Sequence, residues 1–139
     1  MLKEILPISK GFYNWRDQSD NNINYIKSSI ARPISDIYEL AADVYWNDSW
    51  GEEPCDSKTI EEVVRKKILS APKLIPVFAH RYMPLIGGKQ VPIFSIHGTD
   101  VICYGNNIEQ YLKIEFGGMN QNEVDLSSIR SVPFWSELL

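Results

Sequence analysis

The hydrophobic pattern changes at Ala71-Pro72, and this change constrains the fold more than any other feature of the sequence. Before it, apolar residues recur at spacings of three and four, which is typical of one face of a helix. After it come short runs rich in β-branched and aromatic residues, separated by turn residues, which is typical of strands. Helices that precede strands, rather than alternate with them, predict a single α+β domain over residues 1–139.

The helical half contains three predicted elements. Asp20 is a suitable N-cap for a first helix, whose apolar stripe of Ile23, Ile26 and Ile30 should end at Pro33. A second helical pattern covers residues 34–44, although residues 34–38 are also compatible with the start of a strand.

The third helix has the clearest local signals. Thr59 and Glu62 have the spacing of a capping box, in which each side chain satisfies a backbone N–H at the helix start. The predicted buried face follows at Ile60, Val63, Val64 and Ile68, and Ala71-Pro72 should end the helix.

Three strands are predicted in the second half, over residues 74–79, 91–96 and 101–104. Pro76 places the first at a sheet edge or a bulge. His97-Gly98-Thr99-Asp100 supplies the turn of a hairpin between the other two, and residues 80–84 are interpreted as a polar loop. A last helix should run from a cap at Asn106 or Asn107 to Phe116, with Gly117-Gly118 as its stop and an inward face of Ile108, Tyr111, Leu112 and Phe116. Val132, Phe134, Trp135 and Leu138 are expected to fold back as a hydrophobic closure.

Charge and segment composition exclude several classes of protein. The formal net charge is -4, whereas general nucleic-acid binders are usually basic because their affinity comes from neutralising phosphates. Residues 1–10 lack the features of a secretory signal, and no apolar run is long enough to span a membrane. We therefore expect a cytoplasmic protein with no direct nucleic-acid or membrane partner, in which Cys55 and Cys103 are free thiols.

The residues that could support catalysis or metal binding form no recognisable pattern. Ser95, His97, Asp100 and Cys103 lie on the predicted hairpin, but no nucleophile elbow surrounds Ser95, and such residues commonly shape turns. Cys55, His80, His97 and Cys103 are enough to ligate zinc in number, yet their spacings match none of the common ligand pairs. We therefore predict no catalytic residue, no metal and no cofactor.

Residues 43–56, with the sequence DVYWNDSWGEEPCD, are the most unusual stretch. Three aromatic residues lie there among five carboxylates, and aromatic anchors with a charged rim are typical of protein interfaces. The alternative is that the tryptophans belong to the core while the acids solvate a turn. A second polar cluster follows the first predicted strand, where Arg81 could bind a carboxylate or phosphate, or form an internal salt bridge. The candidate partner-binding residues are Trp46, Asp48, Trp50, Glu52, Glu53, His80, Arg81 and Tyr82.

Several stretches of the chain resemble the SUKH superfamily, whose namesakes include fungal regulators of cell-wall glucan synthesis. The resemblance rests on residues 13–16, on YWNDSWG at 45–51, on APKLIPVFAHRYMP at 71–84 and on VPIFSIHGTDVICYGNNIEQYLKIEF at 91–116. Many bacterial relatives carry the positions that are here Pro92, Phe94, Ser95, Ile96, Thr99, Asp100, Val101, Ile102, Tyr104 and Gly105. His97-Gly98 departs from them, because many relatives have an aromatic and a polar residue there.

The resemblance implies a twisted, mostly antiparallel sheet flanked by helices. It also implies a non-enzymatic protein-binding module, since many bacterial members are thought to be immunity proteins that neutralise toxin domains, often nucleases. An acidic surface would suit a basic, nuclease-like toxin partner. Two other hypotheses stay open: a regulatory or small-ligand-binding domain that uses residues 80–84 and the Trp-rich segment, and a small hydrolase-like enzyme built on the hairpin residues.

Overall fold

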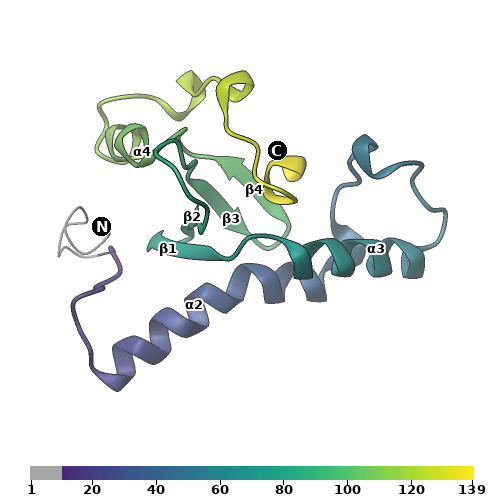
Figure 1. Cartoon of the computed structure of the whole chain (residues 1–139), viewed down its shortest axis with the longest axis horizontal. Coiled ribbons are helices and arrows are strands. Elements are labelled where there is room, and N and C mark those ends of the chain that lie inside the picture. Colours follow the sequence, from purple (N-terminus) through teal and green to yellow (C-terminus); the bar gives the residue numbers. More distant parts are fainter. Residues whose placement is uncertain (1–10) are drawn as a thin grey trace.

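Four short strands form one antiparallel sheet, in which every strand pairs with its neighbours in the sequence (Figure 1). The computed structural model describes residues 11–139, so the expectation that residues 1–10 hold no secretory signal lies outside the described residues. The sheet order is β1-β2-β3-β4, with strands at Leu74–Phe78, Arg81–Pro84, Phe94–His97 and Asp100–Cys103. Within residues 11–139 three α-helices accompany it, which confirms the predicted α+β class: α2 at Asp20–Glu39, α3 at Ser57–Ser70 and α4 at Ile108–Glu115.

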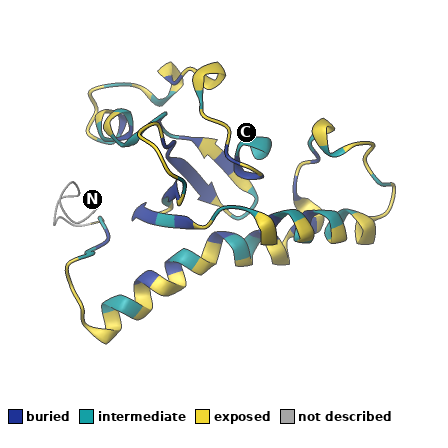
Figure 2. Ribbon diagram, in the orientation of Figure 1, coloured by how far each residue is buried: buried dark blue, intermediate teal, exposed yellow. Residues whose placement is uncertain are grey.

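The two faces of the sheet pack against different helices. Neighbouring strand residues point to opposite faces. Tyr82 and Phe94 belong to the core that contains residues of α2 and α3, whereas Met83 and Ile93 join Tyr111 of α4. The sheet therefore lies between an α2–α3 layer and α4, with buried residues concentrated along it (Figure 2). No helix within residues 11–139 combines the length and the apolar character needed to cross a bilayer.

Helix α2 continues through Pro33, so the prediction that this proline ends a helix was wrong, as was the strand alternative for residues 34–38. Its N-cap is Ser19 rather than Asp20. The proline lacks the N–H that would bond the carbonyl of Ser29, and an internal proline costs about 3 kcal/mol. Its ring is buried, however, on the same face as Ile26 and Ile37. Burial of this longer stripe against β1 and α3 offsets the cost.

The N-cap of helix α3 lies three residues before the predicted cap. Asp56 is the N-cap, and its carboxylate accepts a 2.9 Å hydrogen bond from the backbone N–H of Thr59. The predicted capping box of Thr59 and Glu62 was therefore wrong. The predicted face and end of the helix are confirmed, because Val64 and Ile68 are buried and Ala71 is the C-cap.

The sheet contains a strand that the sequence pattern did not indicate. Residues 81–84, interpreted as a loop, form β2 in the middle of the meander. Strand β1 lies at the edge of the sheet and has a register irregularity between Pro76 and Phe78, as the proline predicted. The β3–β4 hairpin is also confirmed: His97 pairs with Asp100, and Gly98 has a φ of 59° at the first turn position, where a type II′ turn needs a positive value.

The C-terminal third closes the domain. Helix α4 is capped by Asn107 and followed by Gly117 at a φ of 78°, both as predicted, but Phe116 is exposed rather than inward. Val132, Phe134 and Trp135 fold back into the α2–α3 core, and Leu138 packs against it. This confirms the predicted hydrophobic closure.

Candidate functional site

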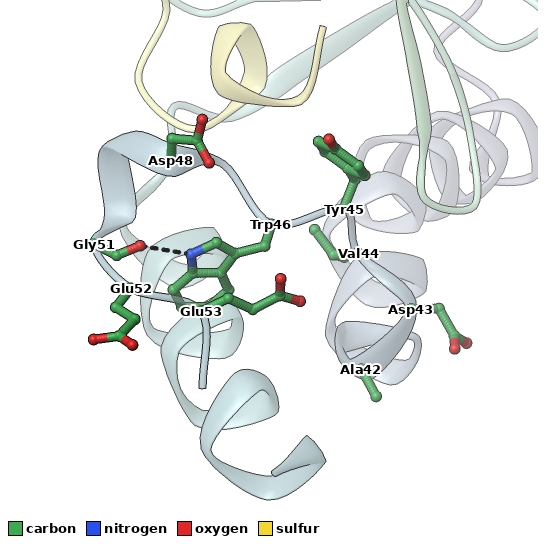
Figure 3. Close-up of a pocket in the computed structure, with 9 residues that line it drawn as sticks. All are labelled: Ala42, Asp43, Val44, Tyr45, Trp46, Asp48, Gly51, Glu52 and Glu53. Atoms are coloured by element: carbon green, nitrogen blue, oxygen red, sulfur yellow. Dashed lines mark hydrogen bonds between the residues drawn. The ribbon is translucent and has the colours of Figure 1, made fainter. Parts of the chain in front are cut away.

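The acidic aromatic loop, which we define as residues 43–53, encloses the candidate site. It begins at the end of the short 3-10 turn Ala41–Asp43 and contains a second one, Asp48–Trp50, on the way from α2 to α3. A pocket of about 440 Å³ opens in it (Figure 3). Its lining is Ala42, Asp43, Val44, Tyr45, Trp46, Asp48, Gly51, Glu52 and Glu53.

The first part of the loop is extended, so its side chains alternate between the core and the solvent. Val44 and Trp46 are buried, and Trp46 retains only 8% exposure. Tyr45 between them is 85% exposed. Figure 3 shows Tyr45 and Trp46 leaving the chain on different sides. Tyr45 is therefore the most exposed aromatic residue of the loop.

Trp46 holds the loop closed on itself. Its indole Nε1 donates a 2.9 Å hydrogen bond to the carbonyl of Gly51. Gly51 has a φ of 96°, a conformation that residues with a β-carbon rarely adopt. The Trp46 ring also meets Trp50 edge-on, with 5.3 Å between ring centroids. These contacts make Trp46 the internal brace of the loop.

Trp50 fastens the loop to the C-terminal closure. Its ring stacks on Phe134 at 6.0 Å, and its indole N–H donates to the carboxylate of Glu137. The ammonium of Lys67 lies 5.0 Å from the centre of the same ring and 3.7 Å from the Glu137 carboxylate. Asn47 adds a 2.8 Å hydrogen bond to the carbonyl of Glu137. Both rings are used in holding the loop, which is the alternative considered above, while the partner-binding role predicted for Trp46 and Trp50 stays a prediction.

The carboxylates of the loop remain free. Asp43, Asp48, Glu52 and Glu53 are all exposed, and none forms an ion pair with another residue in the described part of the chain. Figure 3 shows Asp48, Glu52 and Glu53 around the Trp46 ring. The pocket is thus negatively charged beside an exposed phenol, a chemistry suited to a guanidinium or ammonium group.

The second predicted group, His80 to Tyr82, does not line this pocket. Tyr82 is only 1% exposed and belongs to the core, and its contact with a partner protein stays a prediction. Arg81 donates to Ser95 Oγ at 3.0 Å, lies 3.9 Å from the Glu115 carboxylate and stacks 4.0 Å over the Tyr104 ring. Arg81 therefore forms the internal salt bridge that was the alternative interpretation.

His80 is exposed at the β1–β2 turn, where the preceding Ala79 has a φ of 44°. Burial, the charge of Arg81 and His97 lower the pKa of His80. Arg81 Nη1 contacts His80 Nε2, and a ring nitrogen that accepts from a guanidinium must be unprotonated. Both effects favour the neutral form of the His80 ring.

The hairpin residues considered for catalysis occupy separate environments. Ser95 Oγ accepts from Arg81, while His97 is exposed at the end of β3. Cys103 is buried, and burial raises the pKa of its thiol, which disfavours the nucleophilic thiolate. No three His, Cys, Asp or Glu side chains within residues 11–139 are grouped as a metal site requires. Both cysteines are free, as predicted.

The residue that sequence reasoning left out of the site is Tyr45. The alternation of Val44, Tyr45 and Trp46 carried the signal, because an apolar residue on each side marks the inward positions of an extended segment. No protein-family profile, curated protein or solved structure matches this chain.

Proposed function

We propose that this chain is a non-enzymatic protein-binding module whose acidic aromatic loop receives a basic segment of its partner. One observation carries the proposal. Tyr45 is almost fully exposed beside a pocket lined by four free carboxylates, and the loop that presents them is fixed from within by Trp46 and Trp50.

A fixed loop binds more tightly than a mobile one because less conformational entropy is lost on association. Tyrosine is enriched among the residues that dominate binding energy. An arginine of the partner could lie against the Tyr45 ring while its guanidinium reaches Asp48 or Glu53. The pocket volume of about 440 Å³ has room for such a side chain.

The resemblance to the SUKH superfamily gives the proposal its specific form, an immunity protein that covers the active surface of a nuclease-like toxin in the cytoplasm. Occlusion requires no bond to be made or broken. The net charge of -4 would accelerate encounter with a basic toxin domain, because long-range attraction raises association rates. The free thiols of Cys55 and Cys103 are compatible with a reducing compartment.

The test compares loop variants as bait in quantitative affinity capture from lysate, followed by binding measurements with the purified captured protein. Tyr45→Ala should raise the dissociation rate, whereas Glu52→Lys combined with Glu53→Lys should slow association and flatten its salt dependence. Tyr25→Ala is the matched control, because Tyr25 is exposed on α2 away from the loop. Equal association and dissociation rates for the wild type, the loop variants and the control would show that the loop is not part of the interface.

A further inference from the structure

A second pocket, with a volume of about 250 Å³, lies between α2 and one end of the sheet. In a meander of order β1-β2-β3-β4, the β1–β2 and β3–β4 turns lie at the same end. The structure accordingly brings His80 and His97 together, with their ring centroids 6.2 Å apart. Arg32 and Asp36 of α2 complete the polar rim.

The base of this pocket is apolar. Pro33 of α2 and Ile96 of β3 are both buried and line it. Tyr82 of β2 lines it as well, with its ring inside the α2–α3 core. An apolar base with a few polar groups around it is the usual form of a small-molecule site.

Most polar groups of the pocket have no partner within residues 11–139. The side chains of Arg32, Asp36, Tyr82 and His97 form no hydrogen bond or ion pair with any other side chain or backbone group of residues 11–139. Tyr82 is among the most buried residues of the described chain, but its hydroxyl is not one of the buried side-chain atoms that lack a partner, so the hydroxyl retains contact with solvent. Burial raises the pKa of Tyr82 to about 12, so its hydroxyl remains a proton donor at neutral pH.

Arg32 and Asp36 place opposite charges side by side. They are four residues apart on α2, which brings them to neighbouring positions on the helix surface. They do not pair with each other within 4.0 Å, and both line the pocket. The rim therefore offers one cation and one anion, neither of which is paired within the described part of the chain, to ligand groups of the opposite sign.

We propose that this pocket binds a small zwitterion, an α-amino acid with an apolar side chain. Arg32 receives the carboxylate and Asp36 receives the ammonium group. The apolar side chain of the ligand lies on Pro33 and Ile96, and the Tyr82 hydroxyl donates a hydrogen bond to the carboxylate. The volume is below the roughly 300 Å³ at which pockets for drug-sized ligands begin, which suits a ligand of this size. The inference does not depend on the acidic aromatic loop.

Calorimetric titration of the full chain with three probes tests the proposal. L-Leucine carries both charges, isocaproate keeps the carboxylate alone, and isoamylamine keeps the ammonium alone. We expect L-leucine to bind with a Kd below about 1 mM and each singly charged probe at least about tenfold more weakly, because each loses one charge-assisted hydrogen bond. Absence of leucine binding at about 10 mM, or isocaproate binding as tightly as leucine, would overturn the proposal.

Variants then assign the two charges. Arg32→Gln and Asp36→Asn should each weaken leucine binding by about tenfold or more, and Tyr82→Phe by a smaller factor. Lys27→Gln and Glu39→Gln are the matched controls, since both are exposed on α2 and neither lines the pocket. A melting curve for every variant checks that the fold is intact. Equal affinity losses in the controls would also refute the assignment.

Discussion

The contact between Trp50 and Glu137 gives a prediction whose magnitude follows from the structure. Trp50→Phe keeps an aromatic ring that can stack on Phe134 but removes the indole N–H that donates to the Glu137 carboxylate. A hydrogen bond to a charged group contributes about 1.5–3 kcal/mol. Because the Glu137 side chain is 31% exposed, water can replace the lost donor, and we expect a loss near the lower end, about 1–2 kcal/mol.

Urea unfolding measures this loss, and a double-mutant cycle with Glu137→Gln isolates the pair. The expected coupling energy is about 1 kcal/mol. Trp50→Ala removes the ring as well, and should cost about 3–4 kcal/mol. Tyr45→Phe is the control: its exposed hydroxyl should change the free energy of unfolding by less than about 0.5 kcal/mol. If Trp50→Phe were as stable as the wild type, Trp50 would not fasten the loop.

The same carboxylate predicts a pH signature. Burial raises the pKa of Glu137, but the Phe134 N–H, the Trp50 indole and the charge of Lys67 outweigh it and lower the pKa below the ordinary value of 4.5. A pKa lowered by folding stabilises the protein above the unfolded-state value, and this contribution disappears as pH falls through the folded-state value. The stability difference between wild type and Glu137→Gln should therefore shrink below about pH 4.5. A difference that stays constant into acid would contradict this.

Three further predictions concern the core, metal and thiols. Ile68→Ala should lower the free energy of unfolding, measured with denaturant, by about 2–5 kcal/mol because Ile68 is fully buried. A loss below about 0.5 kcal/mol would mean that the buried face of α3 has been assigned wrongly. Protein purified without chelator or a metal-affinity column should hold no stoichiometric zinc by elemental analysis, since residues 11–139 contain no cluster of ligands. A disulfide reagent should modify exposed Cys55 in the folded protein and buried Cys103 only in denaturant; immediate reaction of both would contradict the burial.

Elements fixed by neighbouring residues could be predicted from the sequence. The β3–β4 hairpin depends on Gly98 in its turn, and α4 depends on Asn107 and Gly117 at its ends. The start of α3 was misplaced because Asp56 and Thr59 are both good caps, and only the geometry selects the bond from Asp56 to the Thr59 N–H.

Elements decided by distant contacts could not be predicted in the same way. Pro33 is accepted inside α2 because its ring completes a stripe that packs on the sheet and α3. Residues 81–84 resembled a loop because Arg81 is charged. In the fold, however, the guanidinium of Arg81 contacts the Glu115 carboxylate and the Tyr104 ring, which lie much later in the chain. A local pattern contains no information about such partners.

For the candidate site, the sequence indicated which residues are exposed acids but not how the tryptophans pack. Asp48, Glu52 and Glu53 are exposed, as their charge indicated. The tryptophans were natural candidates for an interface, but Trp50 finds Phe134 and Glu137 more than eighty positions later in the chain. Tyr45 is left as the exposed ring.

The attachment of the acidic aromatic loop to Glu137 makes two remote segments one thermodynamic unit. Trp50 and Asn47 cannot leave their places without releasing the C-terminal turn, and that turn cannot open without freeing the loop. Their backbone amides should therefore exchange with solvent through a shared local opening. Any ligand that binds only the closed loop will, by mass action, also slow exchange and proteolysis at residues 134–138, far from the surface it touches.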